Sequence, residues 1–338
     1  MIIHARAPVR VDFAGGWSDV PRFAAQEGGV VVNAALALHV HVECRLGGRQ
    51  IRLHAEDLAV RVVAGGPADL VYDGSLDLHK AALNMLPVTG GLELLTRSDV
   101  PPGSGLGASG ALDVALVAAL ARARRERYDP AELAELGFSL EALELKLEGG
   151  RQDQYAAALG GWHELVFGAG AVEVRPIAAS AERRADLERH LVVAYTGQSH
   201  FSDQTHRRVW DAYGGGRSEV VAALRAIRDL GREAAAALRA GDWHGLARVV
   251  DENWRQQRVL DPTISTPAVQ RVEDTARAAG AWGLKATGAG AGGCLLILAP
   301  PEHVPDIRDA VRAAGASPLD AGFAADGAQV WEDDAPDA

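Results

Sequence analysis

Hydrophobic and polar residues alternate along the first third of the chain with the two-residue period of β-strands. Residues 2–16 alternate until two consecutive glycines break the pattern, and residues 29–46 are rich in β-branched side chains, so both segments are predicted strands. Residues 50–64 have the pattern of a further hairpin, and residues 91–100 that of a strand. Between them, residues 76–87 have the apolar spacing of a helix.

The remainder of the chain alternates longer helical patterns with short apolar strands. Helices are predicted at 110–127, across 129–148, at 180–189 and within 217–260, and strands at 162–167, at 190–197 and on both sides of a glycine-rich turn near 290. A helix and a last strand follow that turn. These patterns predict an α+β protein of two mixed domains, residues 1–180 and residues 181–338. The boundary is placed where a polar, charged helix at 180–189 leads into an apolar strand and long helical periodicity.

The overall composition narrows the classes of protein. The chain has 338 residues, 48% of them hydrophobic, and a formal net charge of −11, which repels a nucleic acid. The one basic run, residues 121–127, is typical of a solvated helix end. No segment has the roughly 20 apolar residues that span a bilayer, and Cys44 and Cys294 lie in apolar runs. We therefore expect a cytoplasmic protein without nucleic-acid or membrane partners.

The segment PGSGLGASG, residues 102–110, has four glycines in nine positions and runs into an apolar, alanine-rich helix. Glycine contributes no side chain to packing, so such a run indicates that something approaches the backbone closely. The amides at a helix N-terminus attract anions, and a phosphate is the natural ligand. Ser109 is placed either to bind Mg²⁺ beside that phosphate or to cap the helix.

Two better-known phosphate motifs do not fit. The G-x-G-x-x-G pattern occurs twice, at residues 105–110 and 288–293, but neither copy has the strand, turn and helix context of a dinucleotide site. The P-loop pattern G-x-x-x-x-G-K-[ST] does not occur in the sequence.

Four ordered segments resemble the GHMP small-molecule kinases. PPGSGLGASGA resembles the second motif of that family, P-x-x-x-G-L-G-S-S-A, although Ala108 replaces the first serine and Gly110 an alanine. RAPVRVDFAGGWSDV at 6–20 resembles the N-terminal substrate motif, LKATGAGAGGC at 284–294 resembles the third motif, and GGRQDQYAAALGG also agrees. The resemblance spans residues 6–294 and looks closest to the fucokinase and heptose 7-phosphate kinase branch.

This resemblance implies a fold, a reaction and two cofactors. The N-terminal domain is expected to have the ribosomal-protein-S5-domain-2-like fold and the C-terminal domain a ferredoxin-like fold. The activity is expected to be transfer of the γ-phosphoryl group of ATP, with Mg²⁺, to a hydroxyl of a sugar or sugar phosphate. The residues expected to bind ATP are Pro101, Gly103, Ser104, Gly105, Leu106, Gly107, Ala108 and Ser109.

Further residues follow from the same motifs. Asp153 matches the aspartate that accepts or orients the substrate hydroxyl; without the motif, a helix cap is the competing interpretation. Arg10 matches a basic residue beside that aspartate. Ser109 keeps the position of a magnesium ligand, and spacing favours Glu141 over Glu144 as the second one.

The acceptor site is expected at two motifs. The residues concerned are Gly16, Ser18 and Asp19 in the first motif and Gly288 and Gly290 in the third. The branch favours an arginine near the position of His200, which leaves open whether the substrate carries a phosphate. One alternative is a kinase of a non-sugar alcohol such as mevalonate or homoserine. The other is a sensor of sugars or nucleotides without catalysis. A homodimer is one possible assembly.

Overall fold

The computed structural model describes residues 1–198 and 203–333. The strands are β1 (Ile2–Ala14), β2 (Gly29–Leu46), β3 (Ile51–Ala55), β4 (Val60–Ala64), β5 (Leu92–Ser98), β6 (Trp162–Phe167), β7 (Glu173–Pro176), β8 (Leu191–Tyr195), β9 (Gly283–Ala286), β10 (Cys294–Leu298), β11 (Ser317–Leu319) and β12 (Gln329–Asp333). The α-helices are α1 (Pro21–Glu27), α2 (Asp77–Met85), α3 (Ala108–Ala123), α4 (Pro130–Ser139), α5 (Gln152–Leu159), α6 (Ala181–Glu188), α7 (Asp203–Gly214), α8 (Ser218–Ala240), α9 (Trp243–Leu260), α10 (Pro267–Ala278) and α11 (Val304–Ala313). Among these described residues, no helix has both the length and the apolar character needed to cross a bilayer.

The larger of two sheets contains eight strands in the order β12-β1-β2-β5-β3-β4, with β6 and β7 attached to β2. Strand β2 is long enough to take part twice: its first residues pair with β6 and its last with β5. The register of β1 against β2 shifts on either side of residues 10–12, as in a β-bulge. Bulges re-aim the neighbouring side chains, and here they lie beside the motif that resembles a substrate site.

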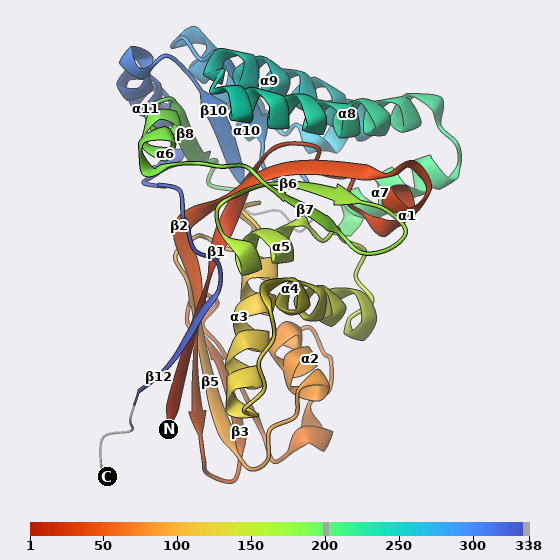
Figure 1. The fold of residues 1–338 in the computed structure, drawn as a ribbon, viewed down its shortest axis with the longest axis vertical. Helices are drawn as coiled ribbons and strands as arrows, with labels where there is room; N and C mark the ends of the chain where they lie inside the picture. The colour runs from red at the N-terminus through yellow and green to blue at the C-terminus, as the bar shows by residue number, and fades with distance from the viewer. Residues whose placement is uncertain (199–202, 334–338) are drawn as a thin grey trace.

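Helix α3 lies against this sheet, and α2, α4 and α5 surround its other sides (Figure 1). The helix is apolar around most of its circumference, and its residues from Gly110 to Ala121 are buried except for Leu112. A helix with apolar residues on every side is stable only when it is covered on every side, which explains the alanine-rich sequence.

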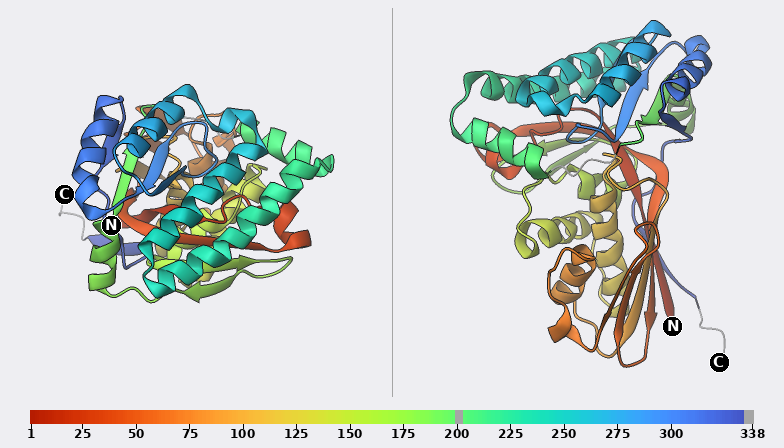
Figure 2. Two further views of the ribbon diagram at one scale, coloured as in Figure 1. Left: turned by 90° about the horizontal axis from the view of Figure 1, so that it is seen from above. Right: turned by 180° about the vertical axis from the view of Figure 1, so that it is seen from behind.

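The smaller sheet has the antiparallel order β11-β8-β10-β9. The helix pair α8 and α9 lies between the two sheets and contributes to both cores (Figure 2). Along α8, Leu224 and Ile227 join the core of the smaller sheet, whereas Leu230 and Ala234 join that of the larger one. The helix ends at Gly241, whose φ of 73° suits glycine at a C-terminal cap. The α8–α9 pair therefore packs into the cores of both sheets.

The end of the described chain returns to the larger sheet. Phe323 packs against Phe13 and Trp162, the amide of Ala324 donates to the Ala35 carbonyl at 2.9 Å, and β12 then pairs with β1. The predicted division at residue 180 immediately precedes α6, while β12 adds a C-terminal strand to the N-terminal sheet. The exact domain boundary stays a prediction.

Most of the predicted elements are confirmed, and two differences concern helices. The segment 129–148 was expected to form one or two helices; α4 ends at Ser139, and a π-helical turn follows at Leu140–Glu144 in place of a second α-helix. Helices α1, α7 and α10 were not predicted. Helix α7 is polar apart from a narrow face, and proline at the start of α1 and α10 reads as a turn signal as readily as a helix start.

Candidate active site

The glycine-rich segment forms a loop that ends as the N-terminus of α3. Gly105 and Gly107 have φ values of 72° and 74°, a left-handed conformation that glycine adopts without steric cost. Gly107 is the N-cap of α3 and Ser109 lies in the first turn, so the alternative that Ser109 caps the helix is wrong. The first amides of a helix have no intrahelical partner and lie at the positive end of its dipole, a geometry that suits a phosphate.

Two neighbouring segments hold this loop in place. On one side, the amide of Arg10 in β1 donates to the Leu106 carbonyl at 2.8 Å, and the Arg10 guanidinium donates to the Gly105 carbonyl at 2.6 Å. On the other side, the amide of Cys294 in β10 donates to the Ser104 carbonyl at 2.7 Å. The loop is therefore fixed between the two sheets.

The third motif packs directly on the loop. A Cβ atom on Gly105 would lie 2.7 Å from the Thr287 carbonyl oxygen, and one on Gly288 would lie 3.0 Å from the Gly105 carbonyl oxygen. Neither position has room for a side chain. Gly290 instead faces the C-terminal half, where a Cβ atom would lie 2.7 Å from a methyl carbon of Ile264. Gly288 is thus the glycine of this turn that packs on the glycine-rich loop.

Asp153 lies in the first turn of α5 and faces the N-terminus of α3. Its Oδ1 accepts from Arg10 Nε at 2.8 Å and pairs with Arg10 Nη2 at 2.7 Å. The N-cap of α5 is Arg151, so the alternative that Asp153 caps this helix is wrong. A Cβ atom on Gly110 would lie 2.6 Å from Asp153 Cβ, and one on Gly107 would lie 3.1 Å from the carboxylate. Glycine at both positions therefore lets the carboxylate approach the loop.

A second carboxylate reaches the same place from the π-helical turn. The amide of Leu145 donates to the Leu140 carbonyl at 3.1 Å, the i to i+5 bond of such a turn, and π-helical turns are frequent at functional sites. Glu141 is hydrogen-bonded to Ser109 and accepts from Gln154 Nε2 at 3.2 Å. Burial and the charge of Asp153 together raise the pKa of Glu141 to about 7. A cation at this position would relieve both effects.

Glu144 has a different environment. Its carboxylate accepts from the Tyr72 hydroxyl at 2.7 Å, beside the loop that precedes α2. The structure therefore brings Glu141, not Glu144, to Ser109 and Asp153. Within the described parts of the chain, no group of three His, Cys, Asp or Glu residues could hold a metal alone. Ser109 and Glu141 are two ligands that could share Mg²⁺ with phosphate and water, the coordination that Mg²⁺ commonly keeps.

The first motif forms a tight turn after β1. The Ser18 hydroxyl donates to the Gly15 carbonyl at 2.7 Å and accepts from the Val30 amide at 3.1 Å, so Ser18 stabilises the turn itself. Asp19 accepts from the Gln152 amide at 3.1 Å, next to Asp153 in sequence. Burial raises the pKa of Asp19 to about 6, and the charge of Asp153 also raises it. Asp19 and Asp153 therefore face a common region.

Sequence reasoning missed several residues of this region. Trp17 has a φ of 80°, a strained value for a bulky residue, and its ring stacks on His206 of α7 at 4.5 Å. Asp113, fully buried on α3 behind Ser109, accepts from Gln154 Nε2 at 3.2 Å. Asp12 and Lys285 form a buried ion pair. Asp113 and Lys285 are single charges inside the apolar segments GALDVALV and AWGLKATG. A single charge in such a segment could have indicated a buried charged residue.

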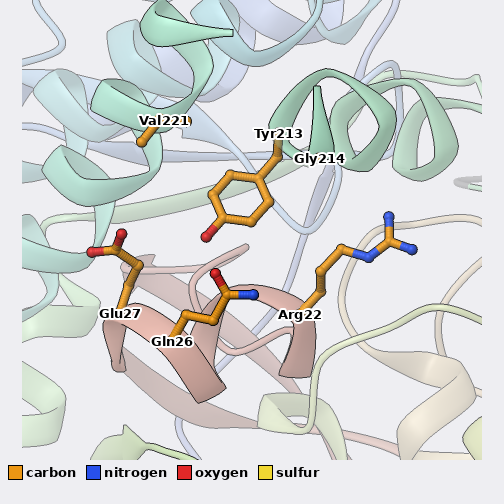
Figure 3. Close-up of a pocket in the computed structure, with 6 residues that line it drawn as sticks. All are labelled: Arg22, Gln26, Glu27, Tyr213, Gly214 and Val221. Carbon is orange, nitrogen blue, oxygen red and sulfur yellow. The ribbon is translucent and has the colours of Figure 1, made fainter. Parts of the chain in front are cut away.

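A cavity of about 410 Å³ lies between α1, α7 and α8 (Figure 3). Glu27, Gln26 and Tyr213 line it, and the Tyr213 ring points toward α1. The Glu27 carboxylate already accepts from the Arg225 guanidinium at 2.6 and 3.1 Å. None of the residues discussed above for phosphate binding or catalysis lines this cavity, so we assign it no part of the chemistry.

Comparisons with known proteins agree with this arrangement. The family model described as GHMP kinases N terminal domain matches residues 69–161, and the one described as GHMP kinases C terminal matches residues 234–317. The chain belongs to the GHMP kinase family, and the predicted two-domain α+β fold is confirmed. As a member of this family, it is an enzyme with ATP as phosphoryl donor.

Individual relatives cover nearly the whole chain. The chain is 28% identical to the D-glycero-alpha-D-manno-heptose 7-phosphate kinase of Campylobacter jejuni, across 97% of this chain and 98% of that protein. It is 29% identical to the bifunctional fucokinase/GDP-fucose pyrophosphorylase of Arabidopsis thaliana, across 86% of this chain and 29% of that longer protein. A crystal structure of a D-glycero-D-manno-heptose 1-phosphate kinase from Bacteriodes thetaiotaomicron superimposes with a TM-score of 0.81, over 98% of this chain and 100% of that one, at 24% identity. The resemblance to the fucokinase and heptose kinase branch is thereby confirmed.

The structure brings most of the predicted site residues together. Arg10, Asp153, Ser109 and Glu141 meet at the glycine-rich loop, and Asp19 lies beside them. Gly16 and Ser18 shape the adjoining turn. His200 lies outside the described residues, so the structure gives no position for it.

Proposed function

We propose that this kinase phosphorylates a hydroxyl of a sugar or sugar phosphate, of the heptose 7-phosphate or fucose type. The observation that carries the proposal is the Arg10–Asp153 pair at the N-terminus of α3. Phosphoryl transfer needs a phosphate cradle, neutralising charge and a group that orients the attacking hydroxyl, and these residues would supply all three. The similarity to heptose and fucose kinases supports a sugar as the acceptor.

Each residue has a separate task in this proposal. The amides from Gly107 to Ser109 bind the transferring phosphate. Asp153 accepts a hydrogen bond from the acceptor hydroxyl, and later its proton, while Arg10 holds that carboxylate in position. Asp19 accepts hydrogen bonds from neighbouring sugar hydroxyls, so an analogue without those hydroxyls binds weakly. Gly16, Ser18, Gly288 and Gly290 shape the walls of this acceptor site.

Ser109 and Glu141 would hold Mg²⁺, which neutralises charge on the β- and γ-phosphates when bound. We expect Glu141→Gln to raise the Mg²⁺ concentration for half-maximal turnover by about tenfold, because an amide is a weaker ligand than a carboxylate. Mg²⁺ titrations at saturating ATP would measure the change. Glu144→Gln is the matched control, because the Glu144 carboxylate accepts a hydrogen bond from Tyr72. An equal shift in the Mg²⁺ concentration for both variants would contradict the assignment of Glu141.

Asp19 should make stability depend on pH. Its pKa is raised from 3.8 to about 6, so the unfolded chain releases this proton at lower pH than the folded protein, and stability falls as pH rises from about 4 to 6. We expect Asp19→Asn to raise the free energy of unfolding at pH 8 by roughly 2 kcal/mol and to leave it unchanged at pH 4. Urea unfolding at both values tests this, and a variant less stable at pH 8 would contradict it.

The proposed function is tested by measuring ADP release with a panel of acceptors. Heptose 7-phosphate, fucose, mevalonate and homoserine cover the sugar phosphate, the plain sugar and the two non-sugar alternatives. We expect turnover with one of the two sugars and none with the other alcohols. Turnover with mevalonate or homoserine would overturn the acceptor class, and ATP binding without any turnover would indicate a sensor.

We also propose a cytoplasmic location. Cys44 and Cys294 are both buried and form no disulfide with each other, and proteins without disulfides are typical of reducing compartments. The homodimer and the lack of nucleic-acid binding stay predictions, which sedimentation and an electrophoretic shift assay would check.

A further inference from the structure

Asp12 and Lys285 form an ion pair in the interior between the two sheets. Asp12 lies on β1 and Lys285 on β9, and each side chain is only 1% exposed. Lys285 Nζ also donates to the Asp12 main-chain carbonyl at 3.1 Å. Removing two charges from water costs several kcal/mol, and apolar residues of similar volume often stabilise a fold equally well. Stability alone is therefore a weak reason for charges at these positions.

Asp12 contacts both motifs that surround the glycine-rich loop. Its Oδ1 accepts from the Gly288 amide at 3.4 Å, and Gly288 packs against Gly105. A Cβ atom on Gly16 would lie 2.7 Å from Asp12 Oδ2, so the turn of the first motif also closes on this carboxylate. A shift of Asp12 would move the third-motif turn and, with it, the loop.

The charge of Asp12 acts on the same guanidinium that Asp153 binds. Arg10 and Asp12 lie two residues apart on a regular part of β1, so their side chains leave the same face of the strand. Burial lowers the pKa of Arg10, but the charges of Asp153 and Asp12 outweigh burial and leave that pKa raised. Arg10 bonds to Asp153 and to the glycine-rich loop, while Asp12 pairs with Lys285.

We propose that Lys285 is a positioning residue for phosphoryl transfer: by pairing with Asp12, it leaves the Arg10 guanidinium to Asp153 and to the glycine-rich loop. Without Lys285, the unpaired Asp12 carboxylate draws Arg10 away from Asp153. The inference rests on the proposed function of this site, because its effect is a loss of turnover.

The test compares Lys285→Met with the double variant Asp12→Asn/Lys285→Met. We expect Lys285→Met to lower kcat by about tenfold or more, with KM for ATP and for the sugar changed less than threefold. Assays run well below each variant's own melting temperature separate this effect from unfolding. In the double variant the competing charge is gone, so we expect kcat to return to within about threefold of wild type, a coupling that a double-mutant cycle measures.

The Glu164–Arg239 pair provides a control away from the glycine-rich loop. It joins β6 to α8 at 2.6 Å, with the Glu164 side chain 6% and the Arg239 side chain 46% exposed, and Arg175 also pairs with Glu164 at 3.5 Å. Arg239→Met should leave kcat unchanged. A wild-type kcat in Lys285→Met, or a double variant as slow as the single one, would overturn the inference. If the wild-type enzyme itself phosphorylates no sugar, the proposed function fails instead.

Discussion

Replacing Asp153 by asparagine should reduce turnover by about 10³-fold and leave ATP binding within about threefold of wild type. The amide still offers an oxygen to the Arg10 guanidinium, which Asp153 binds at 2.7 and 2.8 Å, so the local fold should persist. It cannot, however, accept the proton of the acceptor hydroxyl. Steady-state kinetics and calorimetric titration with a non-hydrolysable ATP analogue would measure the two quantities.

The control for this variant is Asp57→Asn, an equivalent change at an exposed turn. It should leave both turnover and nucleotide affinity unchanged. If Asp153→Asn turned over at the wild-type rate, the carboxylate would have no catalytic role. If it lost ATP binding as well, Asp153 would act on the fold of the loop rather than on the acceptor.

The second large effect is expected at Arg10. Arg10 is 3% exposed, and its guanidinium binds both the Asp153 carboxylate and the Gly105 carbonyl, so Arg10→Met removes support from Asp153 and from the glycine-rich loop together. We expect turnover to fall by about 10²-fold or more, ATP affinity to fall by about tenfold, and the melting temperature to drop.

Arg10→Lys separates charge from geometry. A single ammonium keeps the positive charge but lacks the planar fork that bonds to two groups at once. We therefore expect a turnover between those of wild type and Arg10→Met, with ATP affinity closer to wild type. Equal turnover in Arg10→Met and wild type would contradict the proposed role of the guanidinium.

The sequence predicts the parts of this molecule that depend on local signals. The strand that carries Arg10 follows from alternation, the strands around the third motif follow from short apolar runs, and the loop before α3 follows from its glycines. The family motifs then assign Asp153 and Ser109. The strands and the loop are confirmed because each depends on residues close together in the chain, whereas the roles of Asp153 and Ser109 stay predictions.

What the sequence does not predict depends on contacts between distant segments. Asp12 and Lys285 are 273 positions apart, and their pairing follows only from the way the two sheets meet. The choice of Glu141 over Glu144 depends on a π-helical turn, which rotates the two side chains differently from a regular helix. Spacing favoured the residue that lies beside Ser109, and the structure places Glu144 beside Tyr72 instead.

The most direct test of the whole account is a crystal structure of the enzyme with Mg²⁺, a non-hydrolysable ATP analogue and the sugar found in the acceptor panel. We predict the γ-phosphate within hydrogen-bonding distance of the Gly107–Ser109 amides and the reactive hydroxyl on the Asp153 carboxylate. A nucleotide bound away from this loop, or a hydroxyl that contacts another residue in place of Asp153, would contradict the account.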